Sequence, residues 1–535
     1  MANDEHLAEI AGGPLANRTS IFSHIEQGLR KSPHEAAVIC MDQPANHLSD
    51  LVPVDDDFQQ HNSGNRIDCL TLTYTQLHRV ALTMAAGMRA NGARPGSTIL
   101  TLIPNGGESS LLLWTCIIMR LTFAALDPSA LDASGNTELR NSMKTLKPEV
   151  VVIPNTASAR VVDDAIEGLG LRQPLRILLS GNASNGWKSL LDLAINASNP
   201  PVDENTLLQN ARNDDPDCIH SVLFTSGTSA GRPKGCPQRV SSMTHILHSQ
   251  SWLINTGNCA LVLQQAHNSR AIAPAVTLQT WREGGTVVVP SKSFAIEDTL
   301  DAIIQHRVTF IVLSPAMVHA LAHDLASRPG TLDSVRTIQL GGDTVTKNLL
   351  MKCAALFPSA RVCINHGMTE GGGFFTWPFF QTPISCIPYF GEICPIGAVA
   401  PGARLRIWDA NSKGVTKRGE PGELHVCCES IIGHYLGGAG ESSFYQDEKG
   451  RWFNTGDLAM MNEDDLVFIL GRSKDMFEYA GTAIVPAALE SCIAEYTGAQ
   501  VSIPCLLTRV SRVVFFFYAA DIARTADNIP STRPQ

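Results

Sequence analysis

Apolar and polar positions along the chain follow spacings that predict helices and buried strands. Behind Thr73, which can cap a helix, apolar residues recur at every third or fourth position until Gly92, which can end it. Short apolar runs without polar alternation predict strands that are buried on both faces. The expected strands are 98–103, 150–153, 175–179, 222–224, 286–289, 308–313, 337–340 and 361–364, and further helices are expected at 111–121, 157–169, 296–306 and 315–325. Because strands and helices alternate, the pattern predicts an α/β fold of helix-covered parallel sheets.

The pattern of apolar and polar residues changes on both sides of this region. Residues 1–70 read as irregular and contain an acidic, polar insert between Asp50 and Arg66. From Gly391 to Leu470, glycine and proline become frequent, and short segments such as Leu405–Trp408 predict the strands of a smaller, β-rich unit.

Composition excludes several classes of protein. The chain has 535 residues, of which 44% are hydrophobic and 17% are charged, so it is neither a disordered protein nor a coiled coil. Its net charge of −10 argues against a nucleic-acid partner. The 14 cysteines are scattered, as is typical of reduced thiols, and the longest apolar run stops at Arg120, far short of a membrane span. We therefore expect a cytoplasmic protein with no membrane span.

A loop rich in hydroxyl groups and glycine follows the predicted strand 222–224 and ends at Lys234. Gly227 and Gly231 allow the backbone to approach a ligand, and exposed N–H groups in such loops bind phosphate. The neighbours of Lys234 do not match a Walker A motif. The loop therefore predicts phosphate binding of another kind, with a plain surface loop as the alternative.

Three shorter segments carry further polar chemistry. In Asn365–Gly373, Glu370 follows a predicted strand, where its carboxylate could hold Mg²⁺ against a nucleotide phosphate. Taken alone, a glycine-rich turn is the simpler interpretation. In Asn454–Ala459, Asp457 can accept hydrogen bonds from two ribose hydroxyls or merely cap its turn. Gly471–Asp475 reads as a charged linker.

Taken together and in this order, the four segments resemble the motifs of the adenylate-forming (AMP-binding) superfamily. This superfamily includes acyl-CoA synthetases, luciferases and the adenylation domains of nonribosomal peptide synthetases. The resemblance covers roughly residues 70–490. It implies a large N-terminal lobe made of an α/β AMP-binding core (71–390) and a β-rich subdomain (391–473), preceded by the irregular segment 1–70. A shortened mobile C-terminal domain (474–535) would follow a hinge.

The resemblance also implies a role for each motif residue. Implied in catalysis are Lys234, Thr369, Glu370 and Arg472, with Glu370 also holding Mg²⁺. Implied in binding ATP are Thr225, Ser226, Gly227, Thr228, Ser229, Gly341, Gly342, Asp343, His366, Gly367, Asp457 and the hinge residue Lys474. Implied in the carboxylate pocket are His267, Met368, Gly371 and Gly372. His366 stands where the family usually carries a tyrosine against adenine.

The activity implied is ATP-dependent conversion of a carboxylic acid to its acyl-adenylate. A thioester would then form on coenzyme A or on the phosphopantetheine thiol of an acyl-carrier protein, as a step of secondary metabolism.

The sequence departs from the family pattern in two places. The phosphate loop has one extra residue, Ala230, and no lysine follows Lys474, although the family's C-terminal domain carries a late lysine. The open alternatives are an impaired ligase, the front portion of a longer product, an ATP- or AMP-binding pseudoenzyme, and an adenylation module that depends on a partner carrier or catalytic domain.

Overall fold

The computed structural model describes residues 6–15, 19–53, 68–196, 203–225, 233–254, 260–292, 294–325, 332–438, 440–479, 482–484 and 486. Four predicted phosphate-loop residues, Ser226, Gly227, Thr228 and Ser229, lie outside these ranges. Most of the predicted C-terminal domain, 474–535, and most of the insert between Asp50 and Arg66 also lie outside them.

Two of the sheets are largely parallel. The first has the strand order β10-β9-β5-β4-β6-β7-β8, and the second has the order β15-β14-β13-β11-β12-β2-β3. Only the pairs β9–β10 and β2–β3 are antiparallel. The strands of the first are β4 (Thr98–Thr101), β5 (Thr122–Ala125), β6 (Val150–Asn155), β7 (Leu175–Ser180), β8 (Trp187–Ser189), β9 (Ile219–Phe224) and β10 (Gly235–Arg239). Those of the second are β2 (Ala36–Pro44), β3 (Cys69–Thr73), β11 (Leu261–Leu263), β12 (Thr286–Val289), β13 (Phe310–Leu313), β14 (Thr337–Leu340) and β15 (Arg361–Ile364).

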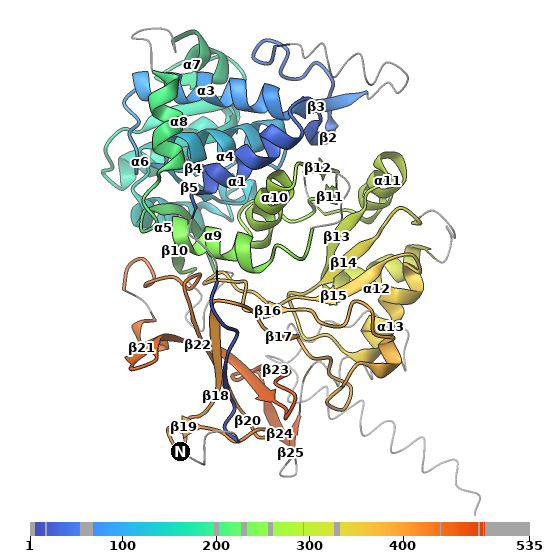
Figure 1. The fold of residues 1–535 in the computed structure, drawn as a ribbon. Helices are drawn as coiled ribbons and strands as arrows, with labels where there is room; N and C mark the ends of the chain where they lie inside the picture. Colours follow the sequence, from blue (N-terminus) through green and yellow to red (C-terminus); the bar gives the residue numbers. More distant parts are fainter. Residues whose placement is uncertain are drawn as a thin grey trace, which may run out of the picture.

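The third sheet is antiparallel and lies below the other two in Figure 1. Its main path is β1-β18-β20-β22-β21, with β19 beside β18 and β23 beside β22. The strands are β1 (Glu9–Ala11), β18 (Ala403–Asp409), β19 (Gly414–Val415), β20 (Pro421–Cys428), β21 (Phe444–Asp447), β22 (Gly450–Met461) and β23 (Val467–Arg472). Two short hairpins pair β16 (Phe375–Thr376) with β17 (Ala398–Val399) and β24 (Phe477–Tyr479) with β25 (Thr482–Ile484).

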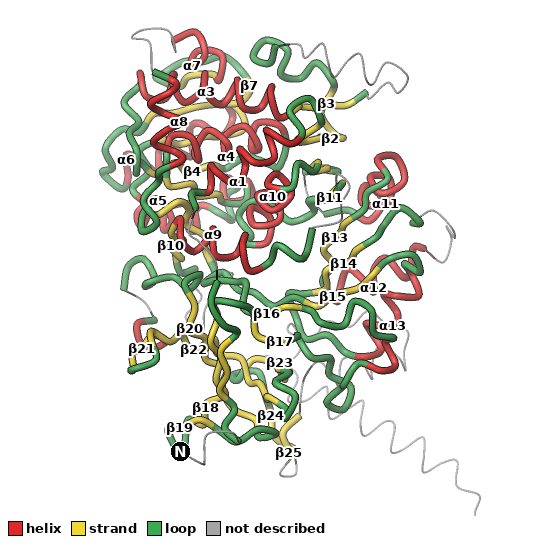
Figure 2. Tube along the Cα trace, viewed as in Figure 1, coloured by secondary structure: helices red, strands yellow, loops and turns green. Residues whose placement is uncertain are grey.

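Helices cover the two parallel sheets, as the red segments of Figure 2 show. They are α1 (Ile21–Lys31), α3 (Tyr74–Ala90), α4 (Gly107–Met119), α5 (Asn136–Leu146), α6 (Ala159–Gly168), α7 (Leu190–Asn196), α8 (Glu204–Arg212), α9 (Val240–Ser249), α10 (Ile272–Arg282), α11 (Ile296–His306), α12 (Pro315–Leu325) and α13 (Lys347–Leu356). One core cluster joins both parallel sheets through α1, α3, α4 and α10. No helix in the described ranges is long and apolar enough to cross a membrane.

Helix α4 is the centre of that core. Every residue of α4 is buried, as expected of a helix that is apolar on nearly all sides. The ring of Trp114 lies 5.1 Å from that of Trp281 on α10 and 6.0 Å from that of Tyr74 on α3. Arg120 ends α4 in the left-handed conformation. Because α4 contacts strands of both parallel sheets, it joins them into one lobe.

The close approach of α1 to α10 depends on a glycine. A side chain at Gly28 would overlap the backbone carbonyl of Trp281. We expect Gly28→Ala to lower the free energy of unfolding by about 1–3 kcal/mol, because backbone cannot move aside as a side chain can. Urea unfolding measures the change. Gln27→Ala, on the exposed face of the same helix, is the control and should stay within about 0.5 kcal/mol of the wild type. Equal midpoints for both variants would contradict this account.

The α/β fold class predicted from the sequence is confirmed, and strands β12, β14 and β15 begin and end where the pattern placed them. Helix α3 begins after Thr73, whose side chain forms a capping box with Gln76. The expectation of irregular structure before residue 70 is wrong for the described residues, because they contain α1, with Ser20 as its cap, and strand β2. The expected domain boundaries themselves stay predictions.

Candidate functional site

An open cleft of about 630 Å³ lies between the second parallel sheet and the antiparallel sheet. Loops that follow β14 and β15 form one wall, and β22 and β23 form the other. Its lining residues are Gly342, Asp343, Thr344, Val345, Ile364, Asn365, His366, Gly367, Cys394, Ile396, Asp457, Ile469, Gly471 and Arg472. The cleft therefore brings three of the four sequence motifs together, at the carboxyl ends of parallel strands where ligands commonly bind.

Asp457 is held by one cation and one imidazole. The residue is 4% exposed, and its carboxylate accepts a hydrogen bond from His366 Nε2 at 3.2 Å and lies 3.1 Å from Arg472 Nη1. Burial alone would raise the pKa of Asp457, but the hydrogen bond and charge of His366, with the charge of Arg472, lower it below the ordinary value. The cleft therefore holds a buried aspartate that stays ionised.

His366 and Asp343 add polar groups to the same cleft. The Nδ1 atom of His366 is buried and has no hydrogen-bond partner among the described residues, so a bound ligand could satisfy it. Asp343 accepts a hydrogen bond from the Thr344 backbone at 2.7 Å. Burial raises the pKa of Asp343, a shift that Arg472 opposes.

The ionised state of Asp457 predicts a pH-dependent contribution to stability. Asp457→Asn should lower the free energy of unfolding at pH 7 by roughly 1–3 kcal/mol, because His366 and Arg472 lose a charged partner. A lowered folded-state pKa stabilises the protein above the ordinary carboxyl pKa of about 4, and this contribution is lost as pH falls through the folded-state value. The gap between variant and wild type should therefore persist from pH 7 to about pH 4 and narrow only below that pH.

Urea unfolding at a series of pH values measures that gap. Asp464→Asn, on the exposed turn after β22, is the control and should leave stability unchanged at every pH. A gap that continues to widen below about pH 4 would refute the assigned direction of the Asp457 shift.

The two ends of the phosphate loop meet each other and contact the second motif. Thr225 N donates to the Lys234 carbonyl at 3.0 Å, and Lys234 N donates to Thr225 Oγ1 at 3.0 Å. The Lys234 ammonium lies 4.6 Å from the centre of the Tyr435 ring. The Tyr435 hydroxyl donates to Glu370 Oε1 at 2.6 Å. The lysine and the glutamate singled out from the sequence are thus joined through a third residue.

The segment between His366 and Gly372 is held mainly through its backbone. Met368 and Gly371 exchange backbone hydrogen bonds of 2.9 and 3.2 Å, which makes a tight turn. The Thr369 carbonyl accepts from Gln238 Nε2 at 2.6 Å, and the Gly372 carbonyl accepts from Ser430 Oγ at 2.6 Å. This turn contains Glu370 and directly follows Gly367, which lines the cleft.

His267 contacts a different loop. Its Nε2 donates to the Ile103 carbonyl at 2.9 Å, and its Nδ1 lies 2.9 Å from Ser269 Oγ. Burial lowers the pKa of His267 below the ordinary value. Its described hydrogen bonds join the loop after β11 of one parallel sheet to the segment after β4 of the other, and none reaches the turn at Met368–Gly371. The role predicted for His267 in the carboxylate pocket remains a prediction.

The remaining predicted residues lie at the rim. Gly341 N donates to the Leu313 carbonyl at 3.2 Å, which fixes the start of the loop that carries Gly342 and Asp343. Lys474 is exposed in a turn closed by the hydrogen bond from Asp475 N to the Arg472 carbonyl, 3.0 Å long. The turn also bonds from Ser473 N to the Gly456 carbonyl at 2.9 Å, so it is attached to the loop of Asp457.

The residues around Glu370 suit a magnesium ion shared with a phosphate. Within the described residues, no group of three or more His, Cys, Asp or Glu side chains is placed to hold a metal alone. Mg²⁺ commonly takes one or two protein carboxylates and completes its shell with water and substrate phosphates. Glu370 supplies one hard carboxylate, which is joined to Lys234 through Tyr435, and therefore fits such an ion.

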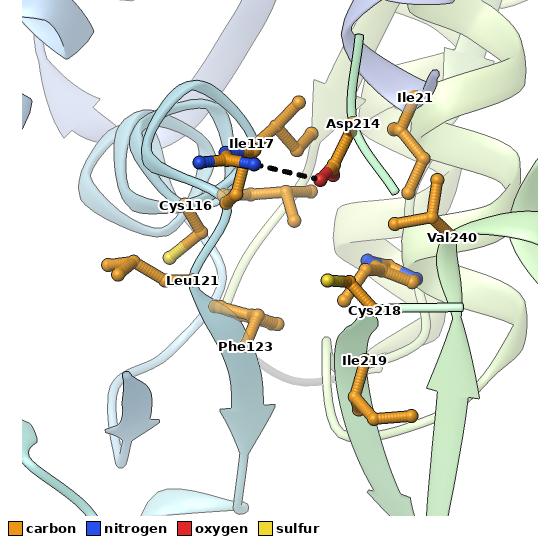
Figure 3. Close-up of a pocket in the computed structure, with 12 residues that line it drawn as sticks. Ile21, Cys116, Ile117, Leu121, Phe123, Asp214, Cys218, Ile219 and Val240 are labelled. Carbon is orange, nitrogen blue, oxygen red and sulfur yellow. Dashed lines mark ion pairs between the residues drawn. The ribbon is translucent and has the colours of Figure 1, made fainter. Parts of the chain in front are cut away.

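A second cavity, of about 350 Å³, lies at the amino-terminal ends of β5 and β9 in the first sheet (Figure 3). It is lined by Leu121 and Phe123 near the start of β5, by Ile219 near the start of β9, and by an ion pair in which Arg120 Nη1 lies 3.7 Å from Asp214 Oδ1. Among the described residues, its lining includes none of the predicted site residues. It is therefore separate from the cleft that holds Asp457.

Comparison with known families gives one match, "AMP-binding enzyme", over residues 61–436. The chain belongs to this family. The matched range covers both ends of the phosphate loop and the turn that contains Glu370, so the resemblance inferred from the four motifs is confirmed. Asp457 and Arg472 follow the matched range.

Proteins similar to this AMP-binding enzyme include ligases. An acyl–CoA ligase of Pestalotiopsis microspora is 48% identical over 497 residues, which cover 93% of this chain and 86% of that protein. 4-Coumarate–CoA ligase 2 of Solanum tuberosum is 25% identical over 439 residues, which cover 79% of this chain and 74% of that protein.

Solved structures similar to this AMP-binding enzyme share its fold. The luciferase-like enzyme of the nonluminescent mealworm Zophobas morio has a TM-score of 0.70 at 18% identity and covers 88% of this chain and 100% of its own. ATP-bound MatB of Rhodopseudomonas palustris has a TM-score of 0.68 at 17% identity and covers 89% of this chain and 83% of its own. At these identities the likeness shows the fold alone.

Sequence reasoning missed Tyr435 in this AMP-binding enzyme. The residue lies in a glycine-rich stretch without helix or strand periodicity, where a lone tyrosine gives no motif. Its partners, Lys234 and Glu370, are far away along the chain. The one available signal is a large aromatic residue with Gly433 shortly before it and Gly437–Gly438 shortly after it.

Proposed function

We propose that this AMP-binding enzyme is an ATP-dependent acid–thiol ligase that activates a carboxylic acid as its acyl-adenylate and transfers the acyl group to coenzyme A. The observation that carries the proposal is the joining of Lys234, Tyr435 and Glu370 next to a cleft that contains the ionised Asp457. A nucleoside triphosphate needs three such groups. They are a lysine for its phosphates, a carboxylate for its Mg²⁺, and an ionised carboxylate that accepts hydrogen bonds from its two ribose hydroxyls. The 48% identical acyl–CoA ligase supports the choice of thiol acceptor.

The residues of the chain would divide the first half-reaction among them. The carboxylate oxygen of the acid attacks the α-phosphorus of ATP, and the bond from that phosphorus to pyrophosphate breaks. Lys234 would donate to the departing phosphates, and Thr369 would contact the α-phosphate. Glu370 would hold Mg²⁺, which when bound neutralises charge on the phosphate oxygens. Fixed donors of this kind lower the barrier because they need no reorganisation as charge develops.

Asp457 and His366 would hold the nucleoside. Asp457, kept ionised by its neighbours, can accept hydrogen bonds from the two ribose hydroxyls. The ring of His366 lies edge-on to Phe375, with ring centres 5.8 Å apart, so its plane is fixed before a base arrives. In the second half-reaction the thiolate attacks the acyl carbon, the acyl–phosphate bond breaks, and AMP leaves with the electron pair.

Two further proposals concern the cellular location and the metabolic role of the enzyme. Free cysteines throughout the described residues support a reducing, cytoplasmic location. The extra Ala230 in the phosphate loop and the insert after Asp50 resemble enzymes of natural-product pathways, which supports a role in secondary metabolism.

Exchange of labelled pyrophosphate into ATP tests the proposed function. A panel of aryl, acyl and amino acids is tested one at a time with Mg²⁺. Exchange driven by at least one acid is expected. ATP binding without exchange for any acid would favour the pseudoenzyme alternative. Product analysis with free coenzyme A, compared with a phosphopantetheine-bearing carrier protein, then decides between the ligase and the carrier-dependent module.

A further inference from the structure

A short segment, Ile432–Leu436, connects the phosphate loop to the turn of Glu370. Ile432 N donates to the Glu370 carbonyl at 2.9 Å, and Leu436 N donates to the Gly235 carbonyl at 2.8 Å. Both ends of the segment are therefore attached by backbone hydrogen bonds to the two motifs. Between these ends, His434 is exposed, and the one buried polar side chain is that of Tyr435, which is 5% exposed.

Tyr435 contacts the cation with its ring and the anion with its hydroxyl. The Lys234 ammonium lies 4.6 Å from the ring centre, within the range of a cation–π contact. The hydroxyl donates to Glu370 Oε1 at 2.6 Å. Burial and the negative charge of Glu370 raise the pKa of Tyr435, so the phenol stays protonated and keeps donating. Phe444 packs against the ring, with ring centres 5.6 Å apart, and limits its motion.

This arrangement keeps two opposite charges apart. Lys234 and Glu370 make no ion pair with each other in the described part of the chain, although both contact the same side chain. A direct pair in a partly buried site would satisfy each charge with the other. It would also withdraw the lysine from the phosphates and the carboxylate from the metal.

We propose that Tyr435 is a positioning residue that separates Lys234 from Glu370 and fixes each for its own ligand, a phosphate for the lysine and Mg²⁺ for the carboxylate. The inference rests on the proposed function, since it assumes that ATP and Mg²⁺ bind here. The hydroxyl orients the carboxylate, and the ring supports the ammonium while leaving its N–H groups available to phosphate.

Equilibrium binding of ATP, measured by titration calorimetry with and without Mg²⁺, tests this role without any turnover. Tyr435→Phe keeps the ring and removes the hydroxyl. It should reduce the gain in ATP affinity that Mg²⁺ provides by about 10-fold and change magnesium-free ATP binding by less than about twofold. Tyr435→Leu also removes the ring, so Lys234 can pair with Glu370, and magnesium-free ATP binding should weaken as well.

Combining Tyr435→Leu with Glu370→Gln provides a rescue. Removing the carboxylate charge should free Lys234 and restore magnesium-free ATP binding, which a merely structural role for the tyrosine would not do. Tyr389→Phe is the matched control, because Lys347 also lies over that ring, at 5.2 Å, and its hydroxyl also donates a hydrogen bond, to the Ile384 carbonyl. It should leave ATP binding unchanged with and without Mg²⁺.

Each result is decisive. A folded Tyr435→Phe variant with the wild-type dependence on Mg²⁺ would overturn the positioning role and leave the proposed function standing. Failure of the double variant to recover would overturn the charge-separation step. A wild-type chain that binds no ATP would overturn the proposed function and this inference together.

Discussion

Replacing Arg406 with alanine is expected to lower the free energy of unfolding by about 3 kcal/mol, because it removes a buried cation from several partly buried polar partners. The side chain of Arg406, on β18, is 5% exposed. Its Nη1 lies 2.8 Å from Asp447 Oδ2 and 3.8 Å from Glu9 Oε2. Its Nη2 donates to the Tyr445 hydroxyl at 2.6 Å, and the guanidinium lies 3.9 Å from the centre of the Trp452 ring. One side chain therefore ties β1, β18, β21 and β22 together.

Urea unfolding followed by tryptophan fluorescence measures the loss. Arg404→Ala is the control, because Arg404 lies two residues earlier on the same strand with an exposed side chain. It should change stability by less than about 0.5 kcal/mol. Similar losses for the two variants would show that the guanidinium network contributes nothing beyond an ordinary surface arginine.

The second large effect is on activity. Glu370→Gln should reduce carboxylate-dependent pyrophosphate exchange by on the order of 10²–10³, as is typical when one fixed charge-stabilising group is lost. Folding should change little, because the glutamine amide oxygen can still accept the hydrogen bond from Tyr435. Exchange rates over a range of Mg²⁺ concentrations, together with the melting temperature, measure both expectations.

Glu138→Gln provides the comparison for that variant. Glu138 is exposed on α5, away from the cleft, and its loss of charge should alter neither exchange nor the response to Mg²⁺. A Glu370→Gln enzyme with an unchanged melting temperature and undiminished exchange would contradict the role assigned to the carboxylate.

Local patterns predicted the fold wherever an element is self-contained. Helix α11 and strand β12 carry their own periodicity and end signals, and their bounds agree with the sequence prediction. Strand β2 pairs with the nearby β3 as well as with the distant β12. It was missed because its first half is buried and its second half, Asp42–Pro44, is polar, so neither strand pattern is complete. Helix α1 was missed because His24 and Gly28 interrupt its apolar face.

For the candidate site, too, the sequence could identify some features and not others. Lys234, Glu370 and Asp457 could be selected because each lies in a short motif with a recognisable order. The contacts that join them could not, since Tyr435 and the pair of His366 with Asp457 depend on side chains that meet only after the sheets have formed. The lowered pKa of Asp457 likewise depends on burial and on the position of Arg472, which spacing along the chain does not reveal.

The burial of α4 on all sides has a consequence for synthesis. The helix is complete at Met119, but Trp281, which covers Trp114, follows about 160 residues later. At a translation rate of roughly 5–20 residues per second, a nascent chain exposes this apolar helix for roughly 8–30 s before its last cover leaves the ribosome. Chaperone supply and growth temperature, more than the stability of the finished lobe, should therefore set the yield of soluble protein in a recombinant host.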